Sequence, residues 1–572
     1  MYILQLNRKE IIMKNSKTTI KELTARYSAI LRKCAFLNAV ILAGFAFATP
    51  ALATDRQYIT SDTTISGVNV ADNEFKAAEG RTDKNKGFGG YAFVKGATLT
   101  VDNSTFSNNT FEDGSAGSIF ASGIDDNTIL KISNSTFTNN HNAYDGGAVG
   151  GYGIQQITNS VFEGNTAALS KDASGNYTVV NADSNPVGGG AISFGAQSNS
   201  DIGSVTETIF KNNISGNNGG AIGTRLGTRP DGRYAADNSK ALLNIAANFS
   251  GNKAYGNGGA IYNTFYADNN LGLGNGVTVT GAFDSNTATK GGAIYNDGAK
   301  DKAGNNGGIM TIYDSSFTGN KATGFGGAIF NTAGAKLTLG NGMTFTGNEA
   351  TKAAGAIYNG GYIAKMDNIV FENNKATQGG AINNAKPSAA SETGTIEAIE
   401  NSKFIGNKAE TSQGGAIRNQ GIIKSIKNTL FEANAATNGG AINNGTWGAI
   451  DNIESIETVK FINNTATTGS LQQGGAIVNA GKIGSIKNVI FEGNKAGKIG
   501  GAIVNTKPQG NPNSSIAFID TQFINNEAGT AGGAIHNALE GILSFSGNTV
   551  FAGNKAGGVL NDIYNDGKLS VE

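Results

Sequence analysis

Residues 485–505 read SIKNVIFEGNKAGKIGGAIVN and contain both of the motifs that recur along this chain. One motif is F-x-x-N, which begins here at Phe491, and the other is G-G-A-I-x-N, which begins at Gly500. The apolar pieces are short, rich in Ile, Val and Phe, and bounded by Gly and Asn, so they indicate short strands joined by tight turns. A helix is disfavoured because Asn and Gly recur every few residues and no apolar pattern with a 3.6-residue period persists.

The F-x-x-N motif occurs fifteen times along the chain. Its phenylalanines are Phe106, Phe137, Phe162, Phe210, Phe249, Phe283, Phe317, Phe345, Phe371, Phe404, Phe431, Phe461, Phe491, Phe523 and Phe551. The step between copies averages about 32 residues, a period typical of solenoid repeats. Short strands at this step, without helices between them, predict an all-β fold, namely a single-stranded parallel β-helix of the pectin-lyase type with about 15 coils.

Each motif residue has an expected place in such a coil. The phenylalanines should stack as an internal column, and the asparagines should form an amide ladder at the turns. The Gly-Gly pair should form a tight turn, because glycine takes positive φ freely. Representative positions are Phe317, Phe371, Phe431 and Phe491 for the column, Asn320, Asn374, Asn434 and Asn494 for the ladder, and Gly291, Gly292, Gly439 and Gly440 for the turn.

The chain divides into four predicted regions. The first is a signal peptide for the Sec export machinery, because basic residues precede an apolar run at 35–47 and an Ala-Leu-Ala cleavage site at 51–53. Its basic part is long, so either the peptide is an extended one or translation starts at Met13. The predicted regions are residues 1–53 for the signal peptide, 54–95 for an N-terminal capping region with degenerate motifs, 96–567 for the β-helix, and 568–572 for the start of an incomplete coil.

Charge and cysteine content exclude several classes of function. The chain has 44 basic and 44 acidic residues, but eight basic and only two acidic residues fall in 1–53, so the remainder carries a net charge of −6. A mildly acidic solenoid has no electrostatic basis for binding nucleic acid or an anionic membrane. The single cysteine, Cys34, lies in the predicted signal peptide, so we expect no disulfide, no cysteine-based metal site and no cofactor in the exported chain.

Eleven unaltered G-G-A-I copies interleaved with fifteen F-x-x-N copies resemble the polymorphic outer membrane proteins of chlamydiae and related autotransporters. The resemblance covers about residues 89–567. It implies export, a right-handed β-helix passenger at the cell surface, and adhesion to host cells, in which the two motifs are themselves implicated. Proteins of this kind end in an outer-membrane β-barrel, whose alternating strands of about ten residues are not found here. We therefore expect a truncated passenger, a released protein, or an anchor in the outer membrane supplied elsewhere.

An enzymatic function is the alternative, because parallel β-helices also serve as polysaccharide lyases and glycoside hydrolases. Such chemistry needs paired carboxylates, or clustered acids that hold calcium beside a basic residue. Asp125 and Asp126 form the one acidic pair of that kind after residue 53, and their setting predicts a polar turn. His141, between two asparagines, and His536, in the variable position of G-G-A-I-x-N, are both predicted to lie at the surface.

The variable stretches between motifs are the predicted contact regions. Residues 169–187, 223–240, 264–276, 385–397 and 506–515 are expected to project as loops. Arg225, Arg229 and Arg233 predict either a basic contact loop for an acidic glycan or a solvated excursion, and Trp447 predicts either a sugar-stacking platform or a ring packed on the coils. The sequence thus favours an exported, non-enzymatic adhesin that binds a host-cell surface protein or glycan.

Overall fold

The computed structural model describes residues 56–75, 89–111, 116–122, 127–171, 177–179, 188–195, 203–225, 242–264, 276–298, 307–386, 393–445, 452–506 and 514–571. The chain splits into two compact units, Met1–Ala51 and Leu52–Glu572, and all of the described residues belong to the second. The described residues form strands and turns but no helix. Within these ranges there is consequently no helix long and apolar enough to cross a membrane.

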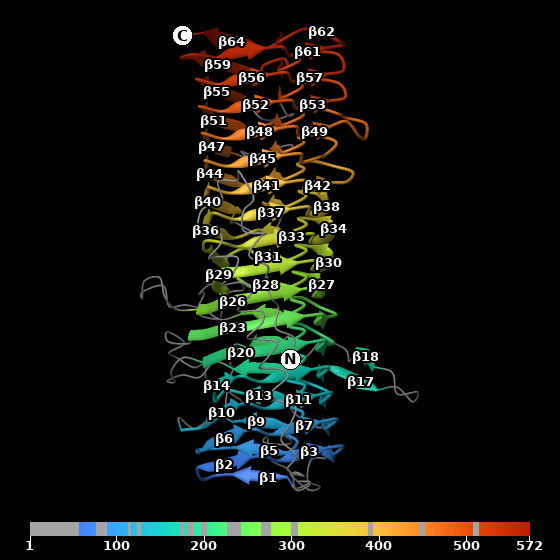
Figure 1. Ribbon diagram of the computed structural model, residues 1–572, viewed down its shortest axis with the longest axis vertical. Coiled ribbons are helices and arrows are strands. Elements are labelled where there is room, and N and C mark those ends of the chain that lie inside the picture. Colours follow the sequence, from blue (N-terminus) through green and yellow to red (C-terminus); the bar gives the residue numbers. More distant parts are fainter. Residues whose placement is uncertain are drawn as a thin grey trace, which may run out of the picture. The chain divides into compact units, whose positions relative to one another are not determined.

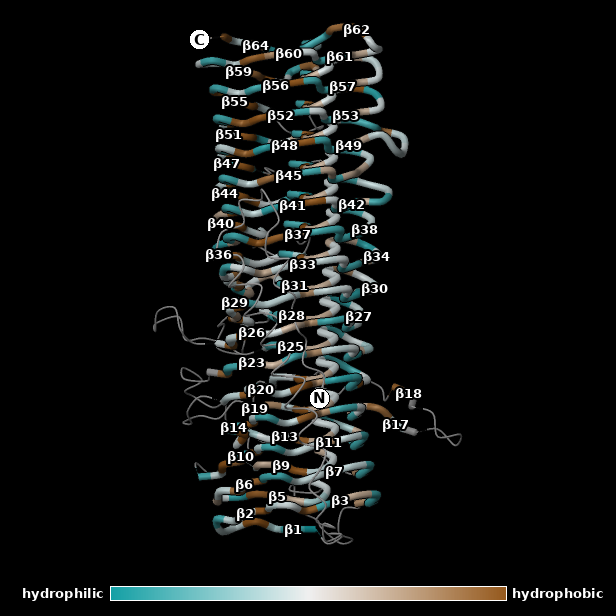
Figure 2. The backbone as a smooth tube through the Cα atoms, viewed as in Figure 1, coloured by the Kyte–Doolittle hydropathy of each residue, from teal (hydrophilic) through white to brown (hydrophobic). Residues whose placement is uncertain are grey.

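The stretch at 485–505 folds as one coil of a parallel β-helix. Its strands are β51 (Lys482–Lys487), β52 (Ile490–Glu492), β53 (Lys495–Ala496) and β54 (Ile503–Asn505). Each strand pairs in parallel with its equivalent in the neighbouring coils, so that β52 lies between β48 (Lys460–Ile462) and β56 (Gln522–Ile524). Figure 1 shows the resulting stack of coils, and Figure 2 shows that polar and apolar segments alternate along each of them. The predicted parallel β-helix is confirmed.

Three kinds of sheet run along the stack. The GGAI sheet, named after the motif whose Ile, x and Asn form its strands, has 17 described strands and includes β54. The Phe sheet has 29 described strands and includes β51 and β52. The third sheet is described in two parts, with 11 strands from β4 (Glu74–Phe75) to β42 (Lys408–Ala409) and five strands from β49 (Thr465–Ala466) to β62 (Val559–Leu560). The apolar core lies between these sheets.

The phenylalanines of F-x-x-N form one continuous internal column, as predicted. Successive rings from Phe106 to Phe551 are stacked with centroids 4.7–5.1 Å apart and planes tilted by 2–14°. Fourteen of the fifteen are essentially inaccessible to solvent, and Phe551 in the last copy is partly buried. The column follows from the pairing register, because each Phe lies directly opposite the next, as Phe491 lies opposite Phe461.

The asparagines of F-x-x-N form a buried ladder beside this column. From Asn109 to Asn554 each side-chain amide donates to the Oδ1 atom of the next asparagine over 2.9–3.0 Å. Each amide also donates to a backbone carbonyl oxygen one coil back, which belongs to Val70 for Asn109 and to a Phe for the others, as for Asn434 and Phe404 over 2.9 Å. The predicted ladder is confirmed, and its burial is tolerable because the amides are fully hydrogen-bonded.

A second ladder, which the sequence reasoning did not separate from the first, is built from the asparagines of G-G-A-I-x-N. From Asn263 to Asn565 these side chains are linked Nδ2 to Oδ1 over 2.6–2.9 Å. They lie where the GGAI sheet ends, and several also donate to a backbone carbonyl at the start of the Phe sheet, as Asn384 does to Ile422 over 3.1 Å. Two of the corners of the coil are therefore fixed by amide ladders.

The two glycines of the motif are required for different reasons. The first adopts positive φ, 61° at Gly291 and 66° at Gly439, as the predicted turn needs. The second does not, but a Cβ on Gly292 or on Gly440 would lie 2.1 Å from the carbonyl oxygen of the equivalent glycine in the next coil. That separation is far below a van der Waals contact, so the coils can approach this closely only without a side chain there.

Two further left-handed positions extend the F-x-x-N motif and were missed in the sequence. One is the residue two after Phe, such as Asn463 (φ 53°) or Gly493 (φ 63°). The other is the residue three before Phe, such as Asn401 (φ 50°) or Asn488 (φ 52°). Asn and Gly are the residues that best tolerate this conformation, so their abundance just around each Phe was the signal that could have revealed both turns.

The regions at either end of the described residues continue the same sheets. Residues 57–75 form β1 (Gln57–Ile59), β2 (Thr63–Ser66), β3 (Asn69–Ala71) and β4, each paired in parallel with the next coil. Residues 568–571 form β64, which pairs in parallel with β59 (Ile542–Ser546). Near this end, β62 turns back and pairs antiparallel with β61 (Lys555–Ala556).

The predicted loop at residues 169–187 contains a hairpin of its own. Within residues 169–187, β17 (Leu169–Lys171) and β18 (Tyr177–Val179) form an antiparallel hairpin that extends away from the stacked coils in Figure 1. The segment projects from the coils as predicted, but its hairpin was not foreseen, because this cross-strand pairing arises without the recurring motifs. The predicted signal peptide, residues 1–53, lies outside the described residues.

Candidate interaction surface

The sequence-predicted contact residues lie almost entirely outside the described part of the chain. Only the backbone of Arg225 is described, as the last residue of β22 (Ile222–Arg225). Arg229, Arg233 and Trp447 fall outside the described residues, as does the acidic pair Asp125 and Asp126. The basic loop and the stacking platform therefore remain predictions.

His141 contradicts its predicted surface position. Its side chain is 1% exposed, and its Nδ1 atom lies 2.7 Å from the Thr166 hydroxyl in the next coil. The flanking Asn140 and Asn142 misled the sequence reasoning, since both are fully buried and donate to backbone carbonyl oxygens over 2.9 Å. In this fold a polar Asn–His–Asn run is an interior run, because the backbone of the neighbouring coil satisfies the amides.

His536 is half-buried rather than freely exposed. Its ring stacks on Tyr564 in the next coil with centroids 4.9 Å apart. Burial lowers the pKa of the imidazole, because the protonated ring loses its hydration there. The variable position of G-G-A-I-x-N is accordingly a packed position in this coil, although it faces away from the core.

The same variable position carries a short stack of outer aromatic rings. Tyr262, Tyr295, Phe330 and Tyr358 follow one another with centroids 5.3, 5.1 and 4.5 Å apart. Burial raises the pKa of the Tyr295 hydroxyl well above its usual range. Because the ring faces are turned towards one another, they are not available to stack on a sugar or a nucleobase.

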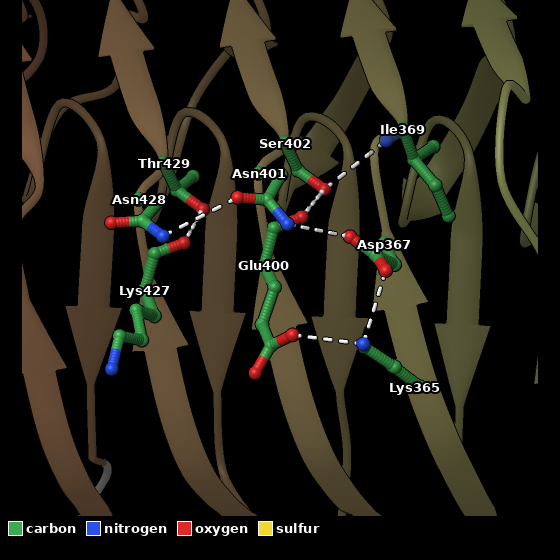
Figure 3. A network of polar contacts seen from close by, with 9 residues as sticks. All are labelled: Lys365, Asp367, Ile369, Glu400, Asn401, Ser402, Lys427, Asn428 and Thr429. Atoms are coloured by element: carbon green, nitrogen blue, oxygen red, sulfur yellow. Dashed lines mark hydrogen bonds and ion pairs between the residues drawn. The ribbon is translucent and has the colours of Figure 1, made fainter.

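The outer side of the Phe sheet carries a network of polar contacts on β36 (Tyr362–Asp367), β40 (Thr395–Glu400) and β44 (Ile422–Lys427), drawn in Figure 3. Lys365 Nζ lies 3.0 Å from an oxygen of Asp367 and 2.9 Å from an oxygen of Glu400 in the next coil. Asn401 donates its side-chain amide to the other oxygen of Asp367 over 2.8 Å. The left-handed asparagines thus link neighbouring coils on the outside of the solenoid.

Buried hydroxyls complete this turn. Ser402 donates to the Glu400 carbonyl oxygen over 2.7 Å and accepts from the backbone amide of Ile369 over 3.2 Å. Thr429 repeats the first of these bonds to Lys427 over 2.8 Å. The hydroxyl two residues before Phe therefore closes the turn that the left-handed Asn opens, which explains why Ser and Thr recur there.

This network is one place among the described residues where stacked coils bring two carboxylates and a base together, so it bears on the enzymatic alternative. The hydrogen bond from Asn401, with help from Lys365, lowers the pKa of Asp367, while bonds to Glu400 and Asp367 raise the pKa of Lys365. A glycosidase acid needs the opposite shift, towards a carboxyl group that keeps its proton near neutral pH. The charges in this network neutralise one another and tie coils together.

The described residues offer no set of side chains suited to binding a metal ion. They contain no group of three or more His, Cys, Asp or Glu side chains that could hold a metal ion. Charged side chains instead pair across coils, as Lys211 does with Glu163 over 2.8 Å and Lys427 with Glu457 over 3.0 Å. Such exposed pairs contribute little to stability individually, but they leave an outer surface patterned by the coil repeat.

The fold and these contacts together define a parallel β-helix repeat protein whose motif residues are structural. Seven segments match the Chlamydia polymorphic membrane protein repeat, at residues 207–225, 247–264, 281–297, 314–332, 368–385, 488–506 and 520–538. The chain therefore belongs with the proteins built from the polymorphic membrane protein repeat. No curated protein matches it.

Membership of this repeat family has coarse functional consequences. The family consists of surface-associated proteins and is not an enzyme family, so the chain corresponds to a surface autotransporter passenger. Each matched segment runs from the turn before an F-x-x-N motif to the end of a G-G-A-I-x-N motif or its equivalent. The family signature therefore coincides with the residues that build the column, the ladders and the glycine turns.

Proposed function

We propose that this protein is an exported adhesin, which binds a protein or glycan of a host-cell surface through the outer faces and loops of its β-helix. One observation carries the proposal: the recurring motifs lie in the interior, with Phe431 and Asn434 fully buried. Contact with a partner must therefore use the outward side chains between the motifs. Those side chains recur once per coil, so many weak contacts can combine into useful avidity.

Beads coated with the purified protein, tested for attachment to cultured animal cells, provide the direct experiment. We expect attachment that exceeds that of beads coated with serum albumin and that soluble protein competes away. Attachment no better than the albumin control would refute the adhesin. The variant Arg225→Ala with Arg229→Ala and Arg233→Ala, and separately Trp447→Ala, would then show whether the predicted loop residues carry the contact.

An enzymatic passenger would behave differently in a second assay. Incubation of the protein with a panel of polysaccharides, followed by measurement of reducing ends and of unsaturated uronate absorbance, detects hydrolase and lyase activity respectively. We expect no turnover, because the polar network lowers the pKa of Asp367, which is the opposite of what a proton donor needs. Turnover that survives further purification would overturn the non-enzymatic proposal.

A further inference from the structure

The third sheet carries a regular line of lysines on its outer side. It includes β24 (Lys253–Ala254), β27 (Thr287–Lys290), β30 (Lys321–Phe325), β34 (Glu349–Ala353), β38 (Lys375–Gln378) and β42. These six consecutive strands and the turns just after them each contribute one lysine. The lysines are Lys253, Lys290, Lys321, Lys352, Lys375 and Lys408, and we call this surface the lysine face.

Pairing register fixes how these lysines are arranged. The first residues of the strands lie opposite one another in sequence order, with Lys253 opposite Thr287, Thr287 opposite Lys321, and Lys375 opposite Lys408. Lys290 and Lys352 lie near the far ends of β27 and β34. These two strands begin with Thr287 and Glu349 rather than with a lysine. Because neighbouring strands are about 4.8 Å apart, a positive charge recurs about every 5 Å along the lysine face.

Most of this charge is not neutralised within the described residues. Two acidic residues share these strands and turns: Glu349 lies 3.4 Å from Lys321, and Glu410 lies 2.9 Å from Lys375. The other four lysines have no ion pair within the described ranges. Three of those four lie over aromatic rings, with Lys253 Nζ 4.1 Å from the centroid of Tyr255. A ring positions an ammonium group but leaves its charge available to a partner.

The strip between the two rows of lysines carries a threonine in four successive coils, with Tyr255 in the coil before them and Glu410 in the coil after them. Thr289 donates its hydroxyl to the Tyr255 carbonyl oxygen over 2.8 Å, and Thr377 donates to the Thr351 carbonyl oxygen over 2.6 Å. Thr351 makes the same bond to Thr323 in the coil before it. These short side chains are held against the backbone, so the strip stays low between Tyr255 and Glu410, and their hydroxyl oxygens remain able to accept hydrogen bonds.

We propose that the lysine face binds a linear anionic polysaccharide that carries sulfate or carboxylate groups along its length. Lysines that recur once per coil, distributed over two parallel rows, are matched by an extended polymer with recurring negative charges, and Lys binds sulfate or carboxylate as a point charge. The proposal rests on the adhesin function, for which it names the chemistry of the partner. Single-stranded nucleic acid is disfavoured because its bases would find no free ring face in the adjoining aromatic stack, and duplex DNA serves as the competing polyanion in the test.

The test compares two variants of the full protein with the same change in net charge. The first carries Lys253→Gln, Lys290→Gln, Lys352→Gln and Lys408→Gln on the lysine face. The matched control carries Lys403→Gln, Lys460→Gln, Lys482→Gln and Lys487→Gln, which are exposed lysines of the Phe sheet. The probes are dextran sulfate, polygalacturonate and uncharged dextran, each measured for affinity at several salt concentrations.

We expect the lysine-face variant to bind the charged polymers at least tenfold more weakly than the wild type, while the control variant changes little. The slope of log affinity against log salt should become shallower by about three to four, roughly one for each lysine removed. Equal loss in both variants, equal binding of uncharged dextran, or tighter binding of duplex DNA than of either polysaccharide would overturn the proposal.

Attachment to cells, measured in parallel, separates this inference from the adhesin function. Attachment without affinity for either charged polymer would refute the polysaccharide site and leave the adhesin standing, whereas affinity without attachment would support the site and refute the adhesin. Treating the cells with sulfated-glycan and uronate lyases before the assay distinguishes a polymer fixed to the cell surface from a free one. A loss of attachment after treatment would support the cell-surface source.

Discussion

Replacement of Asn434 by aspartate tests the buried ladder most sharply, because it changes one atom and little volume. The Asn434 side chain donates to Asn464 Oδ1 and to the Phe404 carbonyl oxygen, each over 2.9 Å. It also accepts from the backbone and side-chain amides of Asn407, each over 3.0 Å. In Asn434→Asp both accepted bonds can persist, but both donated bonds are lost and a carboxylate faces two oxygens in a site closed to solvent.

The expected cost follows from these losses. An acceptor left without its donor costs about 1–3 kcal/mol, and a buried charge without a partner raises the total to about 3–5 kcal/mol at neutral pH. The new carboxyl should avoid this by keeping its proton, so its pKa in the folded protein lies above the unfolded value. The stability that protonation restores is therefore fully present below about pH 4, the unfolded pKa, and is lost as pH rises through the folded pKa.

Denaturant unfolding followed by circular dichroism at pH 7 and pH 5 measures the difference between variant and wild type. We expect the deficit of Asn434→Asp to shrink at the lower pH. The matched control is Asn463→Asp, the same change at an exposed left-handed position of the next coil, which should stay within about 0.5 kcal/mol of the wild type. A deficit that is equal in both variants, or that is independent of pH, would refute the buried ladder.

Three further predictions concern other parts of the coil. Phe431→Ala removes a fully buried ring stacked at 4.8 and 4.9 Å on its neighbours and should lower the unfolding free energy by about 3–5 kcal/mol, so an unchanged midpoint would place the ring outside the core. Gly440→Ala should shift the midpoint far more than Gly347→Ala, whose Cβ meets nothing within 4 Å and whose cost is left-handed strain of about 1–2 kcal/mol; equal midpoints would contradict the close approach of the coils. The wild type should lose stability as pH falls below about 6.5, because the imidazole of His536 takes up a proton more readily in the unfolded chain than in the folded one. His536→Asn should reduce that loss in thermal melts at pH 7 and pH 5. An identical pH profile in variant and wild type would refute this role of His536.

The candidate site was less accessible to sequence reasoning than the fold. The pairs Lys365 with Glu400 and Lys427 with Glu457 join residues that are about 30 positions apart, so no local pattern announces them. The lysine face has the same origin, because its six lysines are scattered over more than 150 residues and meet only through the pairing register. The surface prediction for His141 failed because the asparagines beside it donate to backbone carbonyl oxygens of the preceding coil. Those carbonyls are about 30 residues away in the sequence, so the local pattern gives no sign of them.

The sequence by itself determined the repeat, the strand character, and the interior roles of Phe and Asn. These follow from periodicity and local chemistry, because stacking identical coils places identical residues above one another. Only the tertiary structure decided why the second glycine of each pair is needed, which asparagines form a second ladder, and which charges face outward together. Those properties depend on the distance and register between coils, and these are set by packing across about 30 residues of intervening chain rather than by any neighbouring residue.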